Sequence, residues 1–346
     1  MGKILFRVDG NEIIAAGHVM RCLSIAEALR KLGEEVVFVV ADDRPGELIT
    51  GKGFQMDVLN TTWNDLNQET GILCNYVQEN QVNVLLLDSY YVTKEYLQIL
   101  SQYTKIIYID DLKRFDYPVH TIIHYSPFAK EEEYRELYTA EGKLPRILCG
   151  GEYIPLREEF AYQPYEIKEK VSKVLITTGG TDQLNVAGNL LNRLLENKAL
   201  ASLEYHVIIG CFHSDKEGLQ KLAEKHTNIF VHENVNNMSD FMRHCDVAVS
   251  AGGTTLYELC ACGIPTICLE VVDNQQGAVI WQQQDYMEYA GNAYMDMESC
   301  IKQCEKSLMK YMNNRRMREE RSHRMQTLVD GSGAKRIAQY IVNMEG

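Results

Sequence analysis

Strand-sized apolar runs alternate with amphipathic segments along the whole chain. In the first half, the pattern predicts strands at residues 4–8, 36–40, 84–87, 105–109 and 121–124. Residues 18–32 repeat apolar side chains at helical spacing, and Gly33 supplies a helix end. This alternation predicts a parallel sheet with right-handed crossovers, in which ligands bind at the carboxyl ends of the strands.

The same alternation begins again after a charged, tyrosine-rich stretch at residues 152–173. Further strands are predicted at residues 173–177, 204–209, 228–231, 246–250 and 265–269, with a helix at 185–195. The chain is helical from residue 300 onward, with a break at 330–333 before a last helix at 334–342. The pattern predicts an α/β protein with two Rossmann-like, doubly wound domains, at residues 1–160 and 161–330, and a C-terminal helix at 331–346.

Charge and hydropathy restrict the class of protein. The 346 residues carry 35 Lys and Arg against 48 Asp and Glu, a formal net charge of -13, which disfavours binding to nucleic acid. No apolar run approaches the roughly 20 residues that span a bilayer, and no signal-peptide h-region is present. We therefore expect a cytoplasmic protein without membrane insertion. Ten cysteines without a CxxC pair favour reduced, buried thiols over disulfides or zinc ligands.

The first strand-to-helix junction has the features of an anion site. Arg7-Val8-Asp9-Gly10 closes a strand, and Ala16-Gly17-His18 opens a helix. Unpaired amides at a helix N-terminus attract an anion such as phosphate. The same field disfavours the imidazolium form of His18 and favours a neutral ring that can act as a general base. The alternative is a capping or core histidine.

Paired glycines mark two junctions in the second half. The segment 177–182 can contact phosphate or sugar around Gly180, or it can be a simple turn in which Asp182 caps the next helix. The segment 250–258 can hold a diphosphate at the start of a helix and a ribose on Glu258. Its candidate phosphate contacts are Gly252, Gly253, Thr254 and Thr255. A capping box is the alternative.

Amide and acidic side chains complete the candidates. Asn274 and Gln275 follow a strand and can bind sugar hydroxyls or N-acetyl groups, with a solvated turn as the alternative. The pairs Asp42-Asp43 and Asp110-Asp111 can bind a divalent ion, although surface or loop carboxylates are the favoured interpretation. The sequence has no P-loop and no G-x-G-x-x-G after a strand, which disfavours NAD.

Taken in order, these segments form a recognisable set. They are Arg7-x-Asp9, Gly17-His18-x-x-Arg21-x-Leu23, Asp88-x-Tyr90, Asp110-Asp111, Leu156-Arg157-x-Glu159-Phe160, Gly179-Gly180-Thr181-Asp182, Ala251-Gly252-Gly253-Thr254-Thr255-x-x-Glu258, Asn274-Gln275 and Asp330-Gly331-x-Gly333-x-x-Arg336. In this set the chain resembles the UDP-sugar hydrolases of pseudaminic acid biosynthesis and related spore coat polysaccharide proteins. The resemblance runs from residue 3 to about residue 340.

The resemblance implies a GT-B fold, with two Rossmann-like domains facing across a cleft and the nucleotide held mainly by the second. It implies cleavage of UDP-2,4-diacetamido-2,4,6-trideoxy-β-L-altrose at the anomeric carbon by water, with no metal or other cofactor. His18 is implied as the general base, and Asn274 as the residue that orients the sugar. The implied substrate contacts are Asp9, Gly17, Tyr90, Arg157, Gly180, Gly252, Gly253, Thr254, Thr255, Glu258 and Gln275.

The chain departs from the family pattern at two positions. Ala15 stands where the family usually has glycine, and Ser89 interrupts an Asp-Gly-Tyr pattern. Two other functions use the same fold: transfer of the sugar to a spore or surface polysaccharide, and UDP-sugar binding without catalysis. The presence of His18 favours catalysis over binding alone, and the absence of a basic membrane-binding cluster favours the hydrolase over a lipid-linked transferase.

Overall fold

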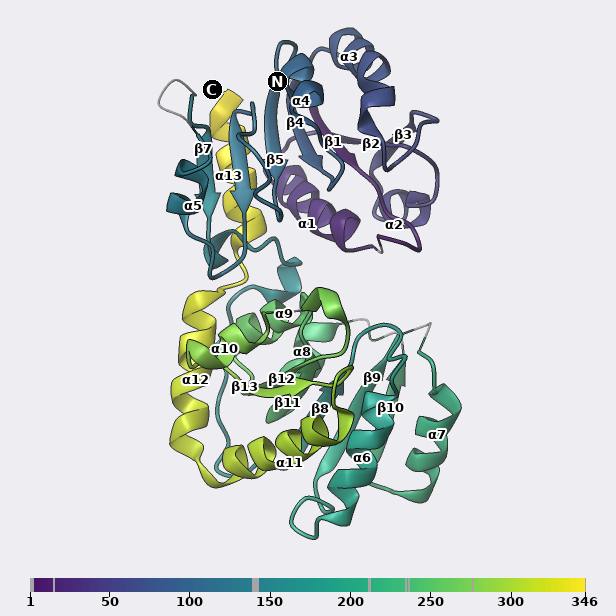
Figure 1. The fold of residues 1–346 in the computed structure, drawn as a ribbon, viewed down its shortest axis with the longest axis vertical. Coiled ribbons are helices and arrows are strands. Elements are labelled where there is room, and N and C mark those ends of the chain that lie inside the picture. Colours follow the sequence, from purple (N-terminus) through teal and green to yellow (C-terminus); the bar gives the residue numbers. More distant parts are fainter. Residues whose placement is uncertain are drawn as a thin grey trace. The chain divides into compact units, whose positions relative to one another are not determined.

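The computed structural model describes residues 3–14, 16–138, 143–210, 213–233, 235, 237–275 and 277–345. The chain divides into two compact units, one formed by Met1–Glu158 with Gly331–Gly346 and the other by Glu159–Asp330. Each unit is a parallel sheet with helices on its faces (Figure 1). Ala15, at which the chain departs from the family pattern, lies outside the described residues.

The first unit is built on seven parallel strands in the order β3-β2-β1-β4-β5-β6-β7. The strands are β1 Lys3–Val8, β2 Val36–Val40, β3 Gln55–Val58, β4 Val82–Asp88, β5 Lys105–Ile109, β6 Thr121–His124 and β7 Arg146–Cys149. Every residue of β2 is buried, as expected for a Val-rich strand covered on both faces. Helices and 3-10 turns connect the strands: α1 Gly17–Lys31, α2 Gly46–Thr50, η1 Leu66–Glu69, α3 Thr70–Glu79, α4 Lys94–Leu100, α5 Glu131–Arg135, η2 Gly151–Tyr153 and η3 Glu158–Phe160.

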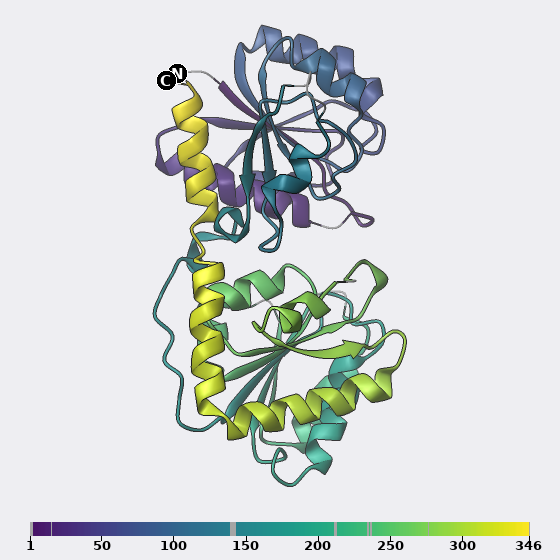
Figure 2. The ribbon, with the colours of Figure 1, turned by 60° about the vertical axis from the view of Figure 1, so that its left-hand side comes forward.

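The last helix of the chain, α13 (Gly333–Glu345), belongs to the first unit. It packs against α1 (Figure 2). Ile337, Ala338 and Ile341 are fully buried. The turn into α13 fits closely, because a Cβ on Gly333 would lie 2.2 Å from the carbonyl oxygen of Ile154. Glycine is therefore required where this helix joins the unit.

The second unit has six parallel strands in the order β10-β9-β8-β11-β12-β13. They are β8 Lys173–Thr177, β9 Glu204–Ile209, β10 Ile229–Glu233, β11 Val247–Ala251, β12 Thr266–Glu270 and β13 Glu288–Asn292. The connecting elements are α6 Val186–Glu196, α7 Lys216–Lys225, α8 Met238–Arg243, α9 Thr255–Cys262, η4 Asp273–Gln275, α10 Val279–Gln283, α11 Met297–Asn313 and α12 Arg315–Leu328. Its core joins residues of β8, β9 and β11 to α6 and α11.

Both sheets reverse their winding next to their first strand. Strands added after β1 proceed outward through β2 and β3, and the chain then returns to place β4 on the other side of β1. In the second sheet, β8 and β11 are the corresponding neighbours. At such a switch point the loops at the carboxyl ends diverge and leave room for a ligand. The candidate residues at positions 9–18, 88–90, 177–182 and 250–258 lie at the carboxyl ends of the central strands, in the loops that follow them or at the start of the next helix.

The strands predicted from apolar runs are confirmed to within two residues at each end. Three outer strands were not predicted, namely β3, β7 and β13. Each is an edge strand with polar or half-exposed positions, such as Gln55 and Asp57 in β3, so its apolar signal is weak.

Candidate active site

His18 and Asp88 meet at the switch point of the first sheet. His18 is the second residue of α1, and Asp88 is the last residue of β4. Both are buried, with 5% and 1% of their surface exposed. The order β1-β4 therefore brings together two residues that are 70 positions apart in the sequence.

The contact with Asp88 fixes which nitrogen of His18 can accept a proton. His18 Nδ1 lies 2.6 Å from Asp88 Oδ1. Burial raises the pKa of Asp88, but attraction to Arg21 and His18 outweighs burial and holds the pKa well below its ordinary value. An ionised carboxylate only accepts hydrogen bonds, so Nδ1–H donates to Asp88. His18 Nε2 is then the proton acceptor of the neutral ring.

Arg21 holds the opposite side of Asp88. Its Nε donates to Asp88 Oδ2 and its Nη2 to Oδ1, which forms a bidentate ion pair. Nη1 donates to Asp111 at 2.9 Å and to the hydroxyl of Tyr125. Asp111 of the acidic pair is thus committed to an ion pair.

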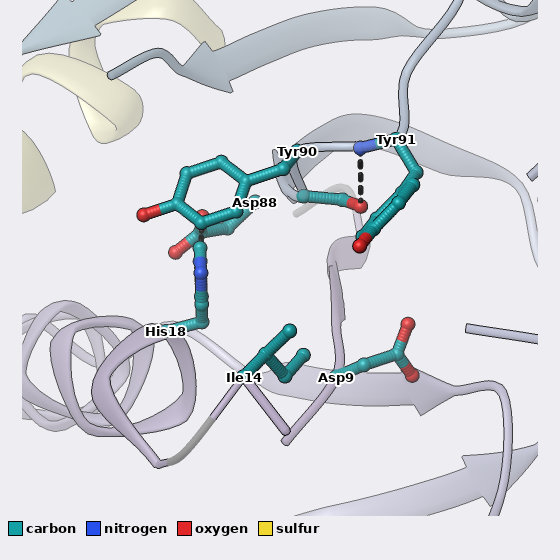
Figure 3. Close-up of a pocket in the computed structure, with 7 residues that line it drawn as sticks. Asp9, Ile14, His18, Asp88, Tyr90 and Tyr91 are labelled. Atoms are coloured by element: carbon teal, nitrogen blue, oxygen red, sulfur yellow. Dashed lines mark hydrogen bonds and ion pairs between the residues drawn. The ribbon is translucent and has the colours of Figure 1, made fainter. Parts of the chain in front are cut away.

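A small pocket opens beside His18 (Figure 3). The Tyr90 ring stands edge-to-face on His18 with 4.5 Å between ring centroids, and burial with the neighbouring Asp111 raises the pKa of Tyr90 to about 12. Ile14 and Tyr91 supply apolar wall, and Trp63 contacts Tyr91 edge-to-face. The pocket thus contains both the His18 ring, which can accept a proton, and a surface of apolar and aromatic side chains.

Ser89, which stands where the resemblance leads us to expect glycine, fits its loop. The backbone of Ser89 is not in the left-handed region that favours glycine. Its hydroxyl accepts a hydrogen bond from the amide of Tyr91 at 3.2 Å, drawn as a dashed line in Figure 3. Ser89 lines the pocket without backbone strain.

Asp9 lines the same pocket, but both of its oxygens are occupied. Oδ2 accepts from Arg7 at 2.6 Å, and Oδ1 accepts from the amide of Ala41 at 2.8 Å. Arg7 in turn forms a buried bidentate pair with Glu69 at 2.7 Å. Asp9 therefore ties the loop after β1 to the end of β2. Gly17 is exposed, and no protein atom lies within 4 Å of a Cβ built on it.

In the second unit, the start of α9 follows the glycine pair, whose own amides donate to the carbonyls of Leu269 and Ala251. The amides of Leu256 and Tyr257 donate to the carbonyls of Gly253 and Thr254, so the amides of Thr254 and Thr255 are those that open the helix. Thr254 is the N-cap residue, yet its side chain makes no capping hydrogen bond. The Thr254 side chain therefore does not cap α9. Gly253 and Thr254 are exposed, as an anion site requires.

Gln275 supports this glycine pair from the side. Its Oε1 accepts from the amide of Val271 at 2.9 Å, and its Cβ lies 3.5 Å from a Cβ built on Gly252. Gln275 thus shapes its own loop with one end of its amide. Asn274 lies in η4, and its side chain is outside the described part of the structure. Glu258 is half-buried in the first turn of α9.

The loop after β8 leads into α6. The N-cap residue of this helix is Asn185, whose side chain accepts from the amide of Gly188, and not Asp182 as the turn interpretation predicted. Asp182 accepts from the amides of Val186 and Ala187, at 2.8 and 2.9 Å, and so stabilises the start of α6. Gly179, with φ of 92°, and Gly180 remain exposed at the loop tip. Arg157 is half-buried and lies in the first unit, just before η3.

Solved structures with the same architecture identify the fold. MurG of Acinetobacter baumannii superposes with a TM-score of 0.71 at 12% identity, over 99% of this chain and 100% of that chain. The UDP-GlcNAc 2-epimerase of Neisseria meningitidis, solved with bound UDP-GlcNAc, gives 0.67 at 12% identity and the same coverage. The chain has the GT-B fold.

Sequence comparisons identify relatives of this chain. Residues 174–341 match the model of the glycosyltransferase family 28 C-terminal domain. An uncharacterized protein of Methanocaldococcus jannaschii is 26% identical over 77% of this chain, which spans 55% of that protein. The UDP-2,4-diacetamido-2,4,6-trideoxy-β-L-altropyranose hydrolase of Campylobacter jejuni is 25% identical over 81% of this chain and 95% of its own length. The chain is distantly related to this hydrolase.

The described residues contain neither a membrane-spanning helix nor a metal-binding cluster. No helix in this part of the chain is long and apolar enough to cross a bilayer. No group of three or more His, Cys, Asp or Glu side chains within it has the arrangement of a metal site. Asp42 forms an ion pair with Arg44, and Asp110 accepts from the amides of Leu112 and Lys113.

Sequence reasoning did not assign a role to Asp88, Arg21, Ile14 or Tyr91. The signal for the first two was present, because both belong to the ordered set of motifs. The rule that ligands bind at the switch point, applied to the predicted strands, would have placed Asp88 beside His18.

Proposed function

We propose that this protein hydrolyses a UDP-linked 2,4-diacetamido-2,4,6-trideoxy sugar at the anomeric carbon and releases UDP and free sugar. The observation that carries the proposal is the His18–Asp88 pair, which leaves Nε2 as the proton acceptor of a residue that lines a pocket. The distant relationship to the hydrolase of Campylobacter jejuni supports the same reaction.

In this mechanism His18 Nε2 takes a proton from water while the water oxygen bonds to the anomeric carbon. The bond from that carbon to the diphosphate oxygen breaks, and its electron pair leaves with UDP. The imidazolium then returns its proton to solvent. Asp88 keeps Nδ1 protonated throughout and stabilises the imidazolium while it exists.

We assign the nucleotide to the second unit. The amides and hydroxyls of Thr254 and Thr255, together with Gly252 and Gly253, would bind the diphosphate and stabilise the charge that develops as UDP departs. Glu258 would accept the ribose hydroxyls. The exposed Gly180, the nearby Gln275 and the loop residue Asn274 are further candidates, with Asn274 orienting the sugar. In the first unit, Tyr90, Gly17 and Arg157 are candidate sugar contacts, and Asp9 shapes the pocket.

A glycosyltransferase is the second candidate, and the match to the glycosyltransferase family 28 C-terminal domain favours it. The donor site would be the same, while a saccharide hydroxyl would replace water. The two functions differ in one observable: a transferase needs an acceptor for turnover.

The test is incubation of the purified protein with UDP-2,4-diacetamido-2,4,6-trideoxy-β-L-altrose, and separately with UDP-GlcNAc, without any acceptor. We expect equal amounts of UDP and free sugar from the first substrate. In ¹⁸O-labelled water, UDP should carry no label, because the bond cleaved lies between carbon and oxygen. UDP binding without turnover of either substrate would contradict the hydrolase and favour the transferase.

The Gly253→Ala variant tests the nucleotide site. We expect its affinity for UDP to fall by about 10- to 100-fold, because hydrogen bonds to a charged group are worth about 1.5–3 kcal/mol each and a Cβ here obstructs the approach to the amides. The fold should tolerate the change, since the nearest protein atom, Gln275 Nε2, lies 4.0 Å from the added Cβ. Calorimetric titration with UDP measures the effect.

The matched control is Gly71→Ala in α3, an exposed helical position with no protein atom within 4 Å of the added Cβ. This variant should bind UDP like the wild type. An unchanged dissociation constant for UDP in Gly253→Ala would contradict the proposal that this loop binds the diphosphate.

A further inference from the structure

We propose that Arg21 is a positioning residue for His18: it fixes the orientation of Asp88, which in turn holds the imidazole ring in the orientation needed to accept a proton. The inference rests on the proposed function, because it assigns Arg21 to the same proton transfer. It concerns a residue that does not itself reach the reacting atoms.

The geometry places Arg21 behind the pair. Arg21 follows His18 by one turn on α1, and only 11% of its side chain is exposed. Its guanidinium spans Asp88 with Nε and Nη2, while Nη1 is held by Asp111 and Tyr125. Both ends of the planar group are therefore fixed, and the group can in turn fix the carboxylate plane.

The protein uses most of the donors of Arg21. A guanidinium has five N–H groups. Two donate to Asp88, and two donate to Asp111 and Tyr125. Nη2 also lies 2.9 Å from His18 Nδ1, which itself donates to Asp88 in the tautomer described above. Four of the five N–H groups are thus used to hold the protein's own side chains.

The orientation of Asp88 depends on this contact. Asp88 Oδ1 is shared by His18 and Arg21, whereas Oδ2 has Arg21 Nε and the more distant thiol of Cys22, at 3.6 Å, as its partners. Without the guanidinium, rotation of the carboxylate would release Oδ1 from His18 Nδ1. The ring could then turn, and the position of Nε2 would no longer be defined.

Charge supplies the second effect. Asp88 favours the imidazolium form of His18 and Arg21 opposes it, so loss of Arg21 leaves the carboxylates unopposed and favours protonation of the base. Asp111 would add to this effect, because Arg21 is its ion-pair partner.

The titratable and charged groups around His18 come from several elements. They are Asp88 from β4, Arg21 and the neutral thiol of Cys22 from α1, Tyr90 after β4, Asp111 after β5, Tyr125 after β6 and the Arg7-paired Asp9 after β1.

The test follows the ring signals of His18 by NMR as a function of pH in the free, full-length protein. We expect the titration midpoint of His18 in Arg21→Gln to lie about one pH unit or more above that of the wild type. The acid limb of the pH–rate profile for UDP release should move in the same direction, so that activity lost at neutral pH returns at higher pH. A purely structural role would lower activity at every pH without this shift.

Arg30→Gln is the matched control, because Arg30 lies on the same helix and donates to the carbonyl of Lys52, away from His18. It should leave the His18 midpoint unchanged. Equal midpoints in Arg21→Gln and the wild type would overturn the proposal. Since this titration needs no turnover, it tests the effect of Arg21 on His18 even if the wild type proves not to be a hydrolase.

Arg21→Lys provides an independent test if the glutamine variant does not fold. Lysine keeps the positive charge but lacks the planar fork. We expect a His18 midpoint near that of the wild type, with kcat reduced about tenfold or more and KM little changed, because only the orientation of the pair is lost. A kcat equal to that of the wild type in Arg21→Lys would also overturn the proposal.

Discussion

His18→Gln is expected to lower kcat for UDP release by roughly 10²- to 10⁴-fold, the range that a positioned general base contributes. Glutamine is polar and similar in length, but its amide cannot accept a proton from water at neutral pH. The affinity for UDP should stay unchanged, because the proposed nucleotide contacts belong to α9 and its preceding loop. Initial rates of UDP release and calorimetric titration with UDP measure the two effects.

The control for this variant is His323→Gln, an exposed histidine on α12 in the second unit. It should retain wild-type activity. A kcat within a few fold of the wild type in His18→Gln would exclude His18 as the base and leave the mechanism to another group in the pocket.

Asp88→Asn is expected to reduce the free energy of unfolding at pH 7 by on the order of 3 kcal/mol. Removing one partner of a buried ion pair leaves the other charge without full compensation, and such changes cost about 3–5 kcal/mol. The lower value is expected because Arg21 retains Asp111. Urea unfolding curves of the two proteins give the difference.

The loss in stability should depend on pH in a defined direction. The pKa of Asp88 is depressed in the folded protein, because Arg21 and His18 outweigh the effect of burial. A carboxyl of this kind stabilises the fold above its unfolded pKa, near about 3.9, and this stabilisation is lost as the pH falls toward the folded pKa. The difference in free energy of unfolding between wild type and Asp88→Asn should therefore be large from about pH 7 to 5. It should begin to decrease only below about pH 4.

Asp42→Asn separates this effect from that of any lost carboxylate. Asp42 also pairs with an arginine, but 32% of its side chain and 36% of that of Arg44 are exposed. Exposed pairs contribute about 0–1 kcal/mol, so this variant should unfold nearly like the wild type. Equal losses in the two variants would mean that the burial of Asp88 has no energetic consequence.

Periodicity predicted the inner strands of both sheets well because these strands are apolar on both faces. β2 and β12, for example, contain only buried residues. Three edge strands, β3, β7 and β13, were missed for the opposite reason, since at least half of their positions are exposed or only partly buried. The fold class followed from the inner strands and the order of the motifs.

The candidate site was predictable only where function lies in a local segment. A helix start such as that of α9 is visible in the sequence, because glycines and hydroxyl residues precede an apolar helix. The Arg21–Asp88 pair is not visible in the sequence, because its members are 67 residues apart and the order of the strands brings them together. Gln275 illustrates a further limit: its amide holds Val271 in place, which residue type alone does not reveal.

The return of α13 to the first unit has a consequence for biosynthesis. Translation proceeds from the N-terminus, so β1 to β7 and α1 leave the ribosome long before α13, which packs against α1 and buries Ile337, Ala338 and Ile341. The second unit is an uninterrupted segment and can fold before α13 emerges. The first unit lacks α13 until then, so the half that contains His18 is the one whose nascent chain most needs protection from aggregation.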